Sequence, residues 1–210
     1  MEIELRKLAW RRWIHQRRQD AEYIVRQMKD FKSGTRGSPL SGGGAIAKAL
    51  TDAETAEAAK YYAGLSPMRS ARIIESTSAP KTTVGRDSQR IKLPGNETEP
   101  LGKRIVEFAE ASAEAPFAAY VPVGSLAAGK LVVEGSKSEE CDSCHGDGLK
   151  GSHDMPSLAG RSPVYIARQL YSFRNGLRTG GVADVMKITI EDLNDDDIIA
   201  AAAYIGSLDP

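Results

Sequence analysis

The segment from Cys141 to Gly151 constrains this chain of 210 residues more than any other. It contains the two cysteines of the sequence, Cys141 and Cys144, and His145 follows the second directly. Two thiols three positions apart, followed at once by an imidazole, form the C-x-x-C-H pattern. In that pattern each thiol bonds one vinyl group of a haem and the imidazole binds the iron. The segment therefore predicts one covalently attached haem c with its iron.

Two other chemistries are open to the same side chains. A zinc ion would need a fourth ligand, for which only His153 is near. A redox-active dithiol would belong in a βαβ setting, whereas the surrounding sequence indicates helices and loops. The haem is favoured, and a zinc or dithiol-redox protein without haem is the alternative.

The iron also needs a second axial ligand. Met186 is expected in a loop 41 residues after His145, between two helices that could wall a pocket. A thioether opposite an imidazole favours ferrous iron and raises the reduction potential. Met155 is the competitor, but it lies only ten residues from His145, a short reach to the opposite face of the ring. We predict His145 and Met186 as the metal ligands.

Composition excludes other classes of protein. Lysine and arginine together number 28, as do aspartate and glutamate, and this zero net charge argues against nucleic-acid binding. No run of 18 apolar residues is present, so no membrane-spanning helix is expected. Residues 1–19 lack the apolar core and cleavage site of a signal peptide and are expected to form a basic arm.

Apolar periodicity and capping residues predict five helices. The expected helices cover residues 20–33, 51–63, 125–134, 162–175 and 194–205. Their expected caps are Asp20, a capping box of Thr51 and Glu54, Ser125, Ser162 and Asn194. A glycine-rich loop is expected over 38–44, and short β-leaning runs over 66–122 predict a small hairpin or sheet.

The predicted helix over 162–175 carries an apolar stripe beside the haem motif. We expect this stripe to face the haem or the core, and it consists of Tyr165, Ile166, Leu170 and Phe173. Arg161 and Arg178 flank the helix. They could pair with the propionates of the haem, but exposure to solvent is the expected outcome.

An internal repeat joins the two ends of the chain. Residues 23–36 align without gaps on residues 165–178, and seven of the fourteen positions are identical. Later matches keep an offset of 142 to 143 residues. Two copies of one domain are therefore predicted, called below the first repeat (20–66) and the second repeat (120–210).

The repeats differ where the chemistry lies. At this offset His145 aligns with Ile3, and Met186 aligns with Gly43 or Gly44. The first repeat thus has no thiols, imidazole or thioether in the equivalent places. Only the second repeat is predicted to bind haem.

These residues together resemble a class I cytochrome c. The resemblance rests on C-x-x-C-H-G, the segment from Pro156 to Gly160, the helix that begins near Tyr165, the methionine and the acid-capped last helix. Tandem copies resemble the two-domain dihaem cytochromes of the c4 type from bacteria. The implied fold is mostly α, with tandem class I cytochrome c domains, the first incomplete, joined by a connection with short β segments. The expected divisions are 1–19, 20–66, 67–119 and 120–210.

The resemblance implies an electron-transfer protein, not an enzyme, that carries single electrons through a His/Met-ligated haem. Its implied partners are a dehydrogenase, an oxidase or a membrane electron-transfer complex. A cytochrome subunit tightly docked to such a complex, and so to a membrane through its partner, is the alternative. The implied compartment is the periplasm. The oligomeric state is not determined.

The resemblance also implies roles for particular residues. Cys141 and Cys144 would carry the thioether bonds, and the carbonyl region of Pro156 would orient the second ring nitrogen of His145. Gly129 and Tyr204 would lie where the first and last helices of the second repeat cross.

The sequence departs from the c4 pattern at its start. In that family the first domain also carries C-x-x-C-H, and a signal peptide exports the protein. Here the missing motif would fall just upstream of Met1. We therefore expect a truncated or shifted gene start, with genuine decay of the first repeat as the alternative.

Overall fold

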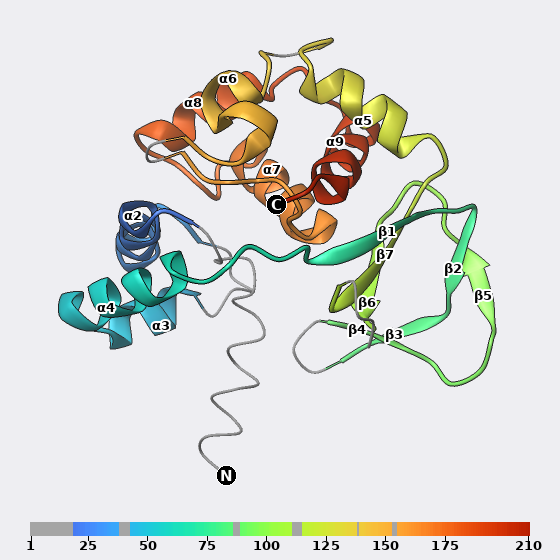
Figure 1. Ribbon diagram of the computed structural model, residues 1–210, viewed down its shortest axis with the longest axis horizontal. Helices are drawn as coiled ribbons and strands as arrows, with labels where there is room; N and C mark the ends of the chain where they lie inside the picture. The colour runs from blue at the N-terminus through green and yellow to red at the C-terminus, as the bar shows by residue number, and fades with distance from the viewer. Residues whose placement is uncertain (1–18, 38–42, 86–88, 111–114, 138, 153–154) are drawn as a thin grey trace.

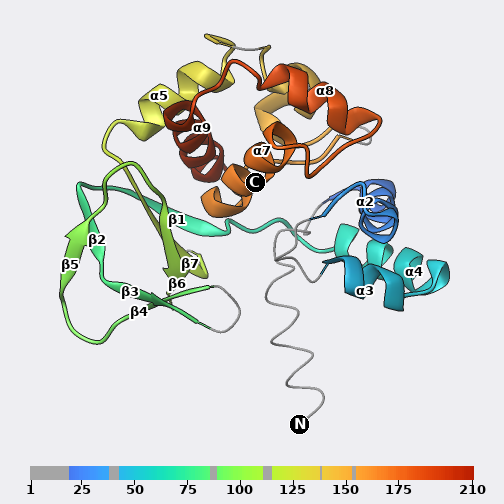
Figure 2. The same cartoon turned by 180° about the vertical axis from the view of Figure 1, so that it is seen from behind.

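The computed structural model describes residues 19–37, 43–85, 89–110, 115–137, 139–152 and 155–210. The predicted basic arm up to residue 18, and His153 of the zinc alternative, lie outside these residues. Helices α2 to α4 form one unit, a group of short strands forms a second, and helices α5 to α9 form a third (Figures 1 and 2). Among the described residues, no helix combines the length and the apolar character needed to cross a membrane.

The first helical unit contains α2 (Ala21–Ser33), α3 (Gly43–Ala49) and α4 (Asp52–Ala63). Asp20 caps α2 by accepting hydrogen bonds from the next backbone N–H groups, and Gly34 ends the helix at φ 88°. Thr51 and Glu54 form the predicted capping box of α4. The glycine-rich loop was predicted to extend to residue 44, which is wrong, because α3 already begins at Gly43.

The strands confirm the small sheet predicted between the repeats. Five of them form one sheet in the order β1-β7-β6-β4-β3, and the remaining two form a separate antiparallel pair, β2-β5. The strands are β1 (Ala71–Glu75), β2 (Ser78–Pro80), β3 (Thr82–Val84), β4 (Arg90–Lys92), β5 (Thr98–Pro100), β6 (Val106–Ala109) and β7 (Phe117–Val121). Strands β2, β3 and β5 were not predicted, because strands this short are defined mainly by their sheet partners and not by a local pattern.

The sheet is fixed to the second helical unit. Glu107 of β6 accepts hydrogen bonds from the hydroxyl of Ser162, at 2.7 and 2.8 Å, and from the backbone N–H of Val164 at 3.4 Å. Ser162 is the N-cap of α7 and Val164 lies in its first turn, where the helix dipole favours a negative charge. Strand β1 also packs against α9. The sheet thereby fixes the entry into α7.

The second helical unit contains α5 (Ser125–Val133), α6 (Asp142–His145), a 3-10 turn (Asp147–Leu149), α7 (Pro163–Arg174), α8 (Val182–Thr189) and α9 (Asp195–Ser207). Ser162 and Asn194 cap α7 and α9 as predicted. Two boundaries differ from the prediction. Gly124, not Ser125, precedes α5, and α9 continues through Gly206 to its end at Ser207.

Helices α5 and α9 cross so closely that one position must be glycine. A methyl group at Gly129 would overlap the carbonyl oxygen of Ala200 and would lie 2.8 Å from Cβ of Tyr204. The predicted meeting of Gly129 and Tyr204 is thus confirmed. The crossing closes one side of the second unit, whose core includes Val132, Ile198 and Ala201.

We expect Gly129→Ala to lower the free energy of unfolding by at least about 2 kcal/mol, because the added methyl forces α5 away from α9. Chemical denaturation followed by circular dichroism measures the change. Gly64→Ala is the matched control, since Gly64 has φ −77° and a methyl there would lie 3.5 Å or more from its neighbours. Equal stability of the two variants would contradict the close crossing.

Candidate functional site

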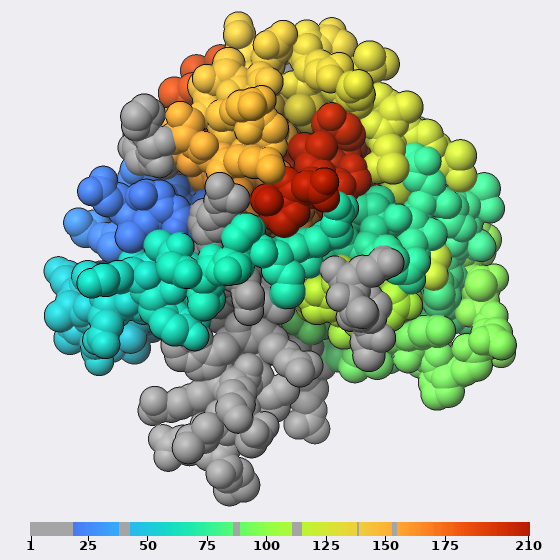
Figure 3. Space-filling model, viewed as in Figure 1, coloured from blue at the N-terminus to red at the C-terminus, as the bar shows by residue number. Residues whose placement is uncertain are grey.

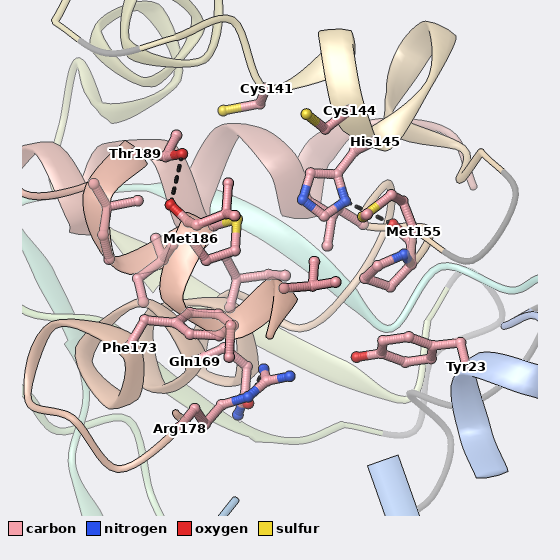
Figure 4. Close-up of a pocket in the computed structure, with 18 of the residues that line it drawn as sticks. Tyr23, Cys141, Cys144, His145, Met155, Gln169, Phe173, Arg178, Met186 and Thr189 are labelled. Carbon is pink, nitrogen blue, oxygen red and sulfur yellow. Dashed lines mark hydrogen bonds between the residues drawn. The ribbon is translucent and has the colours of Figure 1, made fainter. Parts of the chain in front are cut away.

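A cavity of about 580 Å³ lies inside the second helical unit and is closed on one side by α2 of the first repeat (Figure 4). Its volume falls within the range of small-molecule and cofactor sites. The lining is mainly apolar. Cys141, Cys144, His145 and Met186 all line it.

Helix α6 places the two thiols and the imidazole on one turn. Cys141 is half-buried and Cys144 is exposed, and neither forms a disulfide. Burial raises the pKa of the Cys141 thiol to about 11. Gly146 then turns the chain at φ 76°, where a methyl group would lie 2.7 Å from the carbonyl oxygen of Gly151. This turn leaves the thiols at the rim and the imidazole inside.

His145 is buried, and one of its ring nitrogens is hydrogen-bonded to the backbone. Its Nδ1 lies 2.8 Å from the carbonyl oxygen of Pro156. A carbonyl oxygen only accepts, so Nδ1 carries the hydrogen and Nε2 keeps its lone pair. Burial lowers the pKa of His145, and the hydrogen bond to Pro156 partly opposes that shift. The imidazole is therefore neutral near pH 7, the form in which histidine binds metals.

Met186 lies in α8, so its predicted placement in a loop is wrong. The error arose because glycines precede α8 and no side chain caps it. Met155 also lines the cavity, and its backbone forms an isolated antiparallel bridge with Ser152. Figure 4 shows Met155 on the Nδ1 side of the His145 ring, while the other ring nitrogen points toward Met186.

Helix α7 forms the apolar wall. Ile166 and Phe173 are buried, and Tyr165 and Leu170 are half-buried beside them. All four residues line the cavity, as the helical stripe predicted.

Arg161 and Arg178 are buried, so their predicted exposure is wrong. Only 5% of Arg161 and 8% of Arg178 is accessible to solvent. Arg161 donates through Nε to the carbonyl oxygen of Ser157 at 3.2 Å, and burial lowers its pKa to about 10. Both guanidinium groups remain charged at neutral pH. The prediction was wrong because the first repeat covers the surface of the second repeat at these two arginines. The sequence alone does not show that the two repeats pack against each other there.

The two repeats meet through a hydrogen-bond network of two arginines and two glutamines. Arg36 donates to Oε1 of Gln27 at 2.5 Å and to Oε1 of Gln169 at 3.0 Å. Arg178 donates to the same two oxygens, at 2.7 Å for Gln27 and 2.9 Å for Gln169. Each amide oxygen thus accepts one hydrogen bond from each repeat. This set is called the arginine–glutamine network below.

Two backbone hydrogen bonds beside the network also join the repeats, and the two repeats contribute to them in a symmetric way. The N–H of Gly37 donates to the carbonyl oxygen of Leu177, and that of Thr179 donates to Thr35, both at 2.9 Å. These pairs are related by the 142-residue offset of the sequence repeat. Figure 3 shows the first repeat, in blue and cyan, beside the orange part of the second. The repeats therefore associate about an approximate twofold axis.

Sequence reasoning missed Tyr23, Gln27, Arg36 and Gln169 as site residues. Tyr23, Gln27 and Gln169 line the cavity, and Arg36 lies behind the two glutamines. A signal was present, because these positions are among the seven identities of the repeat. In the sequence, the identical residues indicated only that the two repeats share a fold. In the structure, these side chains lie together where the two repeats meet.

The donor set fits a haem c. Two free thiols lie at the rim, and a neutral imidazole nitrogen and a thioether face a cavity with apolar walls. The part of the chain that the structure describes contains no group of three or more His, Cys, Asp or Glu side chains placed to bind a metal.

Comparison with known proteins identifies the relatives of this chain. The profile of the cytochrome c family matches residues 127–209. Cytochrome c-554(548) of Halomonas halodenitrificans is 36% identical over 85 residues, which cover 40% of this chain and 96% of that protein. The thiosulfate dehydrogenase electron acceptor of Stutzerimonas stutzeri is 26% identical over 191 residues, which cover 90% of this chain and 68% of that protein.

A solved structure extends the likeness to the whole fold. Cytochrome c4 of Acidithiobacillus ferrooxidans superposes with a TM-score of 0.57 at 21% identity, over 91% of this chain and 86% of that one. The tandem arrangement of the two repeats is therefore shared with that protein.

We expect Gln169→Leu to lower the free energy of unfolding by about 3 kcal/mol, because Arg36 and Arg178 each lose an acceptor within the interface. Gln169→Glu keeps the acceptor and adds a compensating charge, so its stability should equal or exceed that of the parent. Chemical denaturation of the two variants measures the difference. Equal loss in both would show that the network does not join the repeats.

Proposed function

This chain belongs to the cytochrome c family of haem-c electron carriers, and we propose that it carries one electron at a time through a single haem in its second repeat. The observation that supports the proposal is the convergence of both thiols, His145 and Met186 on one cavity. The haem supplies reversible one-electron chemistry at its iron. The chain itself carries out no bond-making reaction on a substrate.

Each ligating residue has a proposed role set by its position. Cys141 and Cys144 form the thioether bonds at the rim of the cavity. His145 binds the iron through Nε2, because Pro156 holds the hydrogen on Nδ1. Met186, in α8, would supply the second ligand of the iron. The residues of α7 exclude water from the ring, and this lowers the reorganisation that accompanies each electron transfer.

The proposed haem count is one. In the described part of the first repeat, no cysteine, histidine or methionine lies at a position equivalent to a proposed ligand. We propose the divisions 20–66, 67–119 and 120–210, in which the middle segment forms the sheets. The described part of the first repeat keeps helices of a cytochrome domain and supplies none of the proposed haem ligands.

A docked subunit is the second candidate function. Two relatives that match about nine-tenths of this chain are named thiosulfate dehydrogenase electron acceptors. We propose a periplasmic redox enzyme of this kind as the partner. The chain would then accept electrons inside a stable complex instead of diffusing between partners.

The haem content tests the proposal directly. Co-expression with the haem-ligation machinery should yield one haem per chain, with the c-type α band in the reduced-minus-oxidised spectrum. Cys144→Ser should reduce covalent attachment to one thioether and shift that band. A ratio of two haems, or the lack of a c-type band, would overturn the single-haem cytochrome.

Substitution of the two methionines tests the axial ligand. Met186→Ala should abolish the sulfur-to-iron absorption in the far red and lower the reduction potential, because the thioether stabilises ferrous iron. Met155→Ala is the matched control and should leave both unchanged. The reverse result would assign the ligand to Met155.

A further inference from the structure

We infer that Glu107, in strand β6 between the repeats, is a positioning residue of the haem site and that its negative charge lowers the reduction potential. This role rests on the proposed haem in the second repeat. It gives the segment 67–119 a function beyond joining the repeats, because one carboxylate of that segment makes electron uptake depend on pH.

Glu107 is linked to the cavity wall through two hydrogen bonds. The hydroxyl of Ser162 donates to both carboxylate oxygens, and the backbone N–H of Val164 donates to Oε2. Ser162 is 1% exposed, and its hydroxyl oxygen also accepts from the backbone N–H of Tyr165 at 3.1 Å. Tyr165 lines the cavity. The carboxylate of the sheet therefore holds the turn of α7 from which this wall residue projects.

The carboxylate lies directly behind the cavity wall. Ile105, two residues before Glu107, packs against the core of the second helical unit. Side chains two apart in a strand share a face, so Glu107 also points toward the helices. Tyr165 and Ile166, at the start of α7, line the cavity on the other side of that helix. One helix, about 10 Å across, thus separates the carboxylate from the cavity.

The surroundings of Glu107 favour its neutral form. Burial raises the pKa of Glu107, and the hydrogen bonds from Ser162 and Val164 and the charge of Arg168 partly oppose that rise. Arg168 is exposed in α7, and the ladder partner of Glu107 in β7 is Ala119. Among the described residues, Arg168 is therefore the charged side chain that acts on this carboxylate.

A negative charge behind the wall acts on the iron through its field. Ferric iron is more positive than ferrous iron by one charge, so an ionised Glu107 stabilises the ferric state. Reduction therefore favours protonation of Glu107, with the electron supplied by the redox partner and the proton by solvent. The reduction potential should fall as the pH rises through the pKa of Glu107.

The test is the reduction potential of the purified holoprotein between about pH 4 and about pH 9, a range that begins near the ordinary carboxyl pKa. Glu107→Gln keeps an acceptor oxygen and removes the charge. It should raise the equilibrium constant for reduction about threefold at the alkaline end, which equals roughly 30 mV, and leave it unchanged at the acid end. Glu75→Gln is the matched control. Glu75 accepts from the N–H of Leu126 in the first turn of α5, and Leu126 does not line the cavity.

Ser162→Ala provides a second route if Glu107→Gln does not fold. It keeps the carboxylate but removes a hydrogen bond that lowers its pKa, so the pH-dependent step should move to higher pH. Chemical denaturation at each pH gives a readout that does not involve the potential. The parent should lose stability relative to Glu107→Gln as the pH rises, because the native state binds the proton of Glu107 more tightly than the unfolded state does.

Three results would overturn this role of Glu107. The first is a shift of the potential in Glu107→Gln that is no larger than in Glu75→Gln, or that is equal at both ends of the pH range. The second is a change in stability without a change in potential, which would show a structural role alone. The third is a pH-dependent step that stays in place in Ser162→Ala. A parent protein without covalent haem would instead refute the proposed function.

Discussion

Two buried guanidinium groups that share two amide oxygens hold this molecule together. Arg36 and Arg178 come from different repeats, yet each donates to both Gln27 and Gln169. Two of these hydrogen bonds, from Arg36 to Gln169 and from Arg178 to Gln27, cross between the repeats, so separation of the repeats would remove acceptors from two buried guanidinium groups, which is costly. The end of the haem cavity is formed by this contact. The same side chains therefore form one end of the pocket and the interface between the two repeats.

The rest of the second repeat holds the cavity open from other sides. The crossing at Gly129 fixes α5 against α9, and Glu107 of the sheet fixes the first turn of α7. Helix α7 carries the apolar wall, so the sheet acts on the pocket through α7. The segment between the repeats is thus more than a connection, because it contributes a carboxylate to the helix that faces the cavity.

Local signals predicted most of the helical framework. Caps at Asp20, Thr51, Ser162 and Asn194 marked four helix starts, because each acts within one turn of its own helix. Met186 was wrongly placed in a loop because α8 has no side-chain cap to mark its start. Short strands such as β3 were missed because sheet partners, not local pattern, define them.

The sequence by itself determined the chemistry: two thiols, an imidazole, a haem-type motif and a repeat with an offset of 142 to 143 residues. These features depend on covalent bonding capacity and on spacing along the chain, which the sequence states directly. Tertiary structure decided what surrounds them. It buried Arg161 and Arg178, expected at the surface, and brought Gln27 into a pocket formed mostly by residues more than 100 positions away, with Arg36 behind it. Such contacts depend on how two folded units pack, and no local pattern encodes that packing.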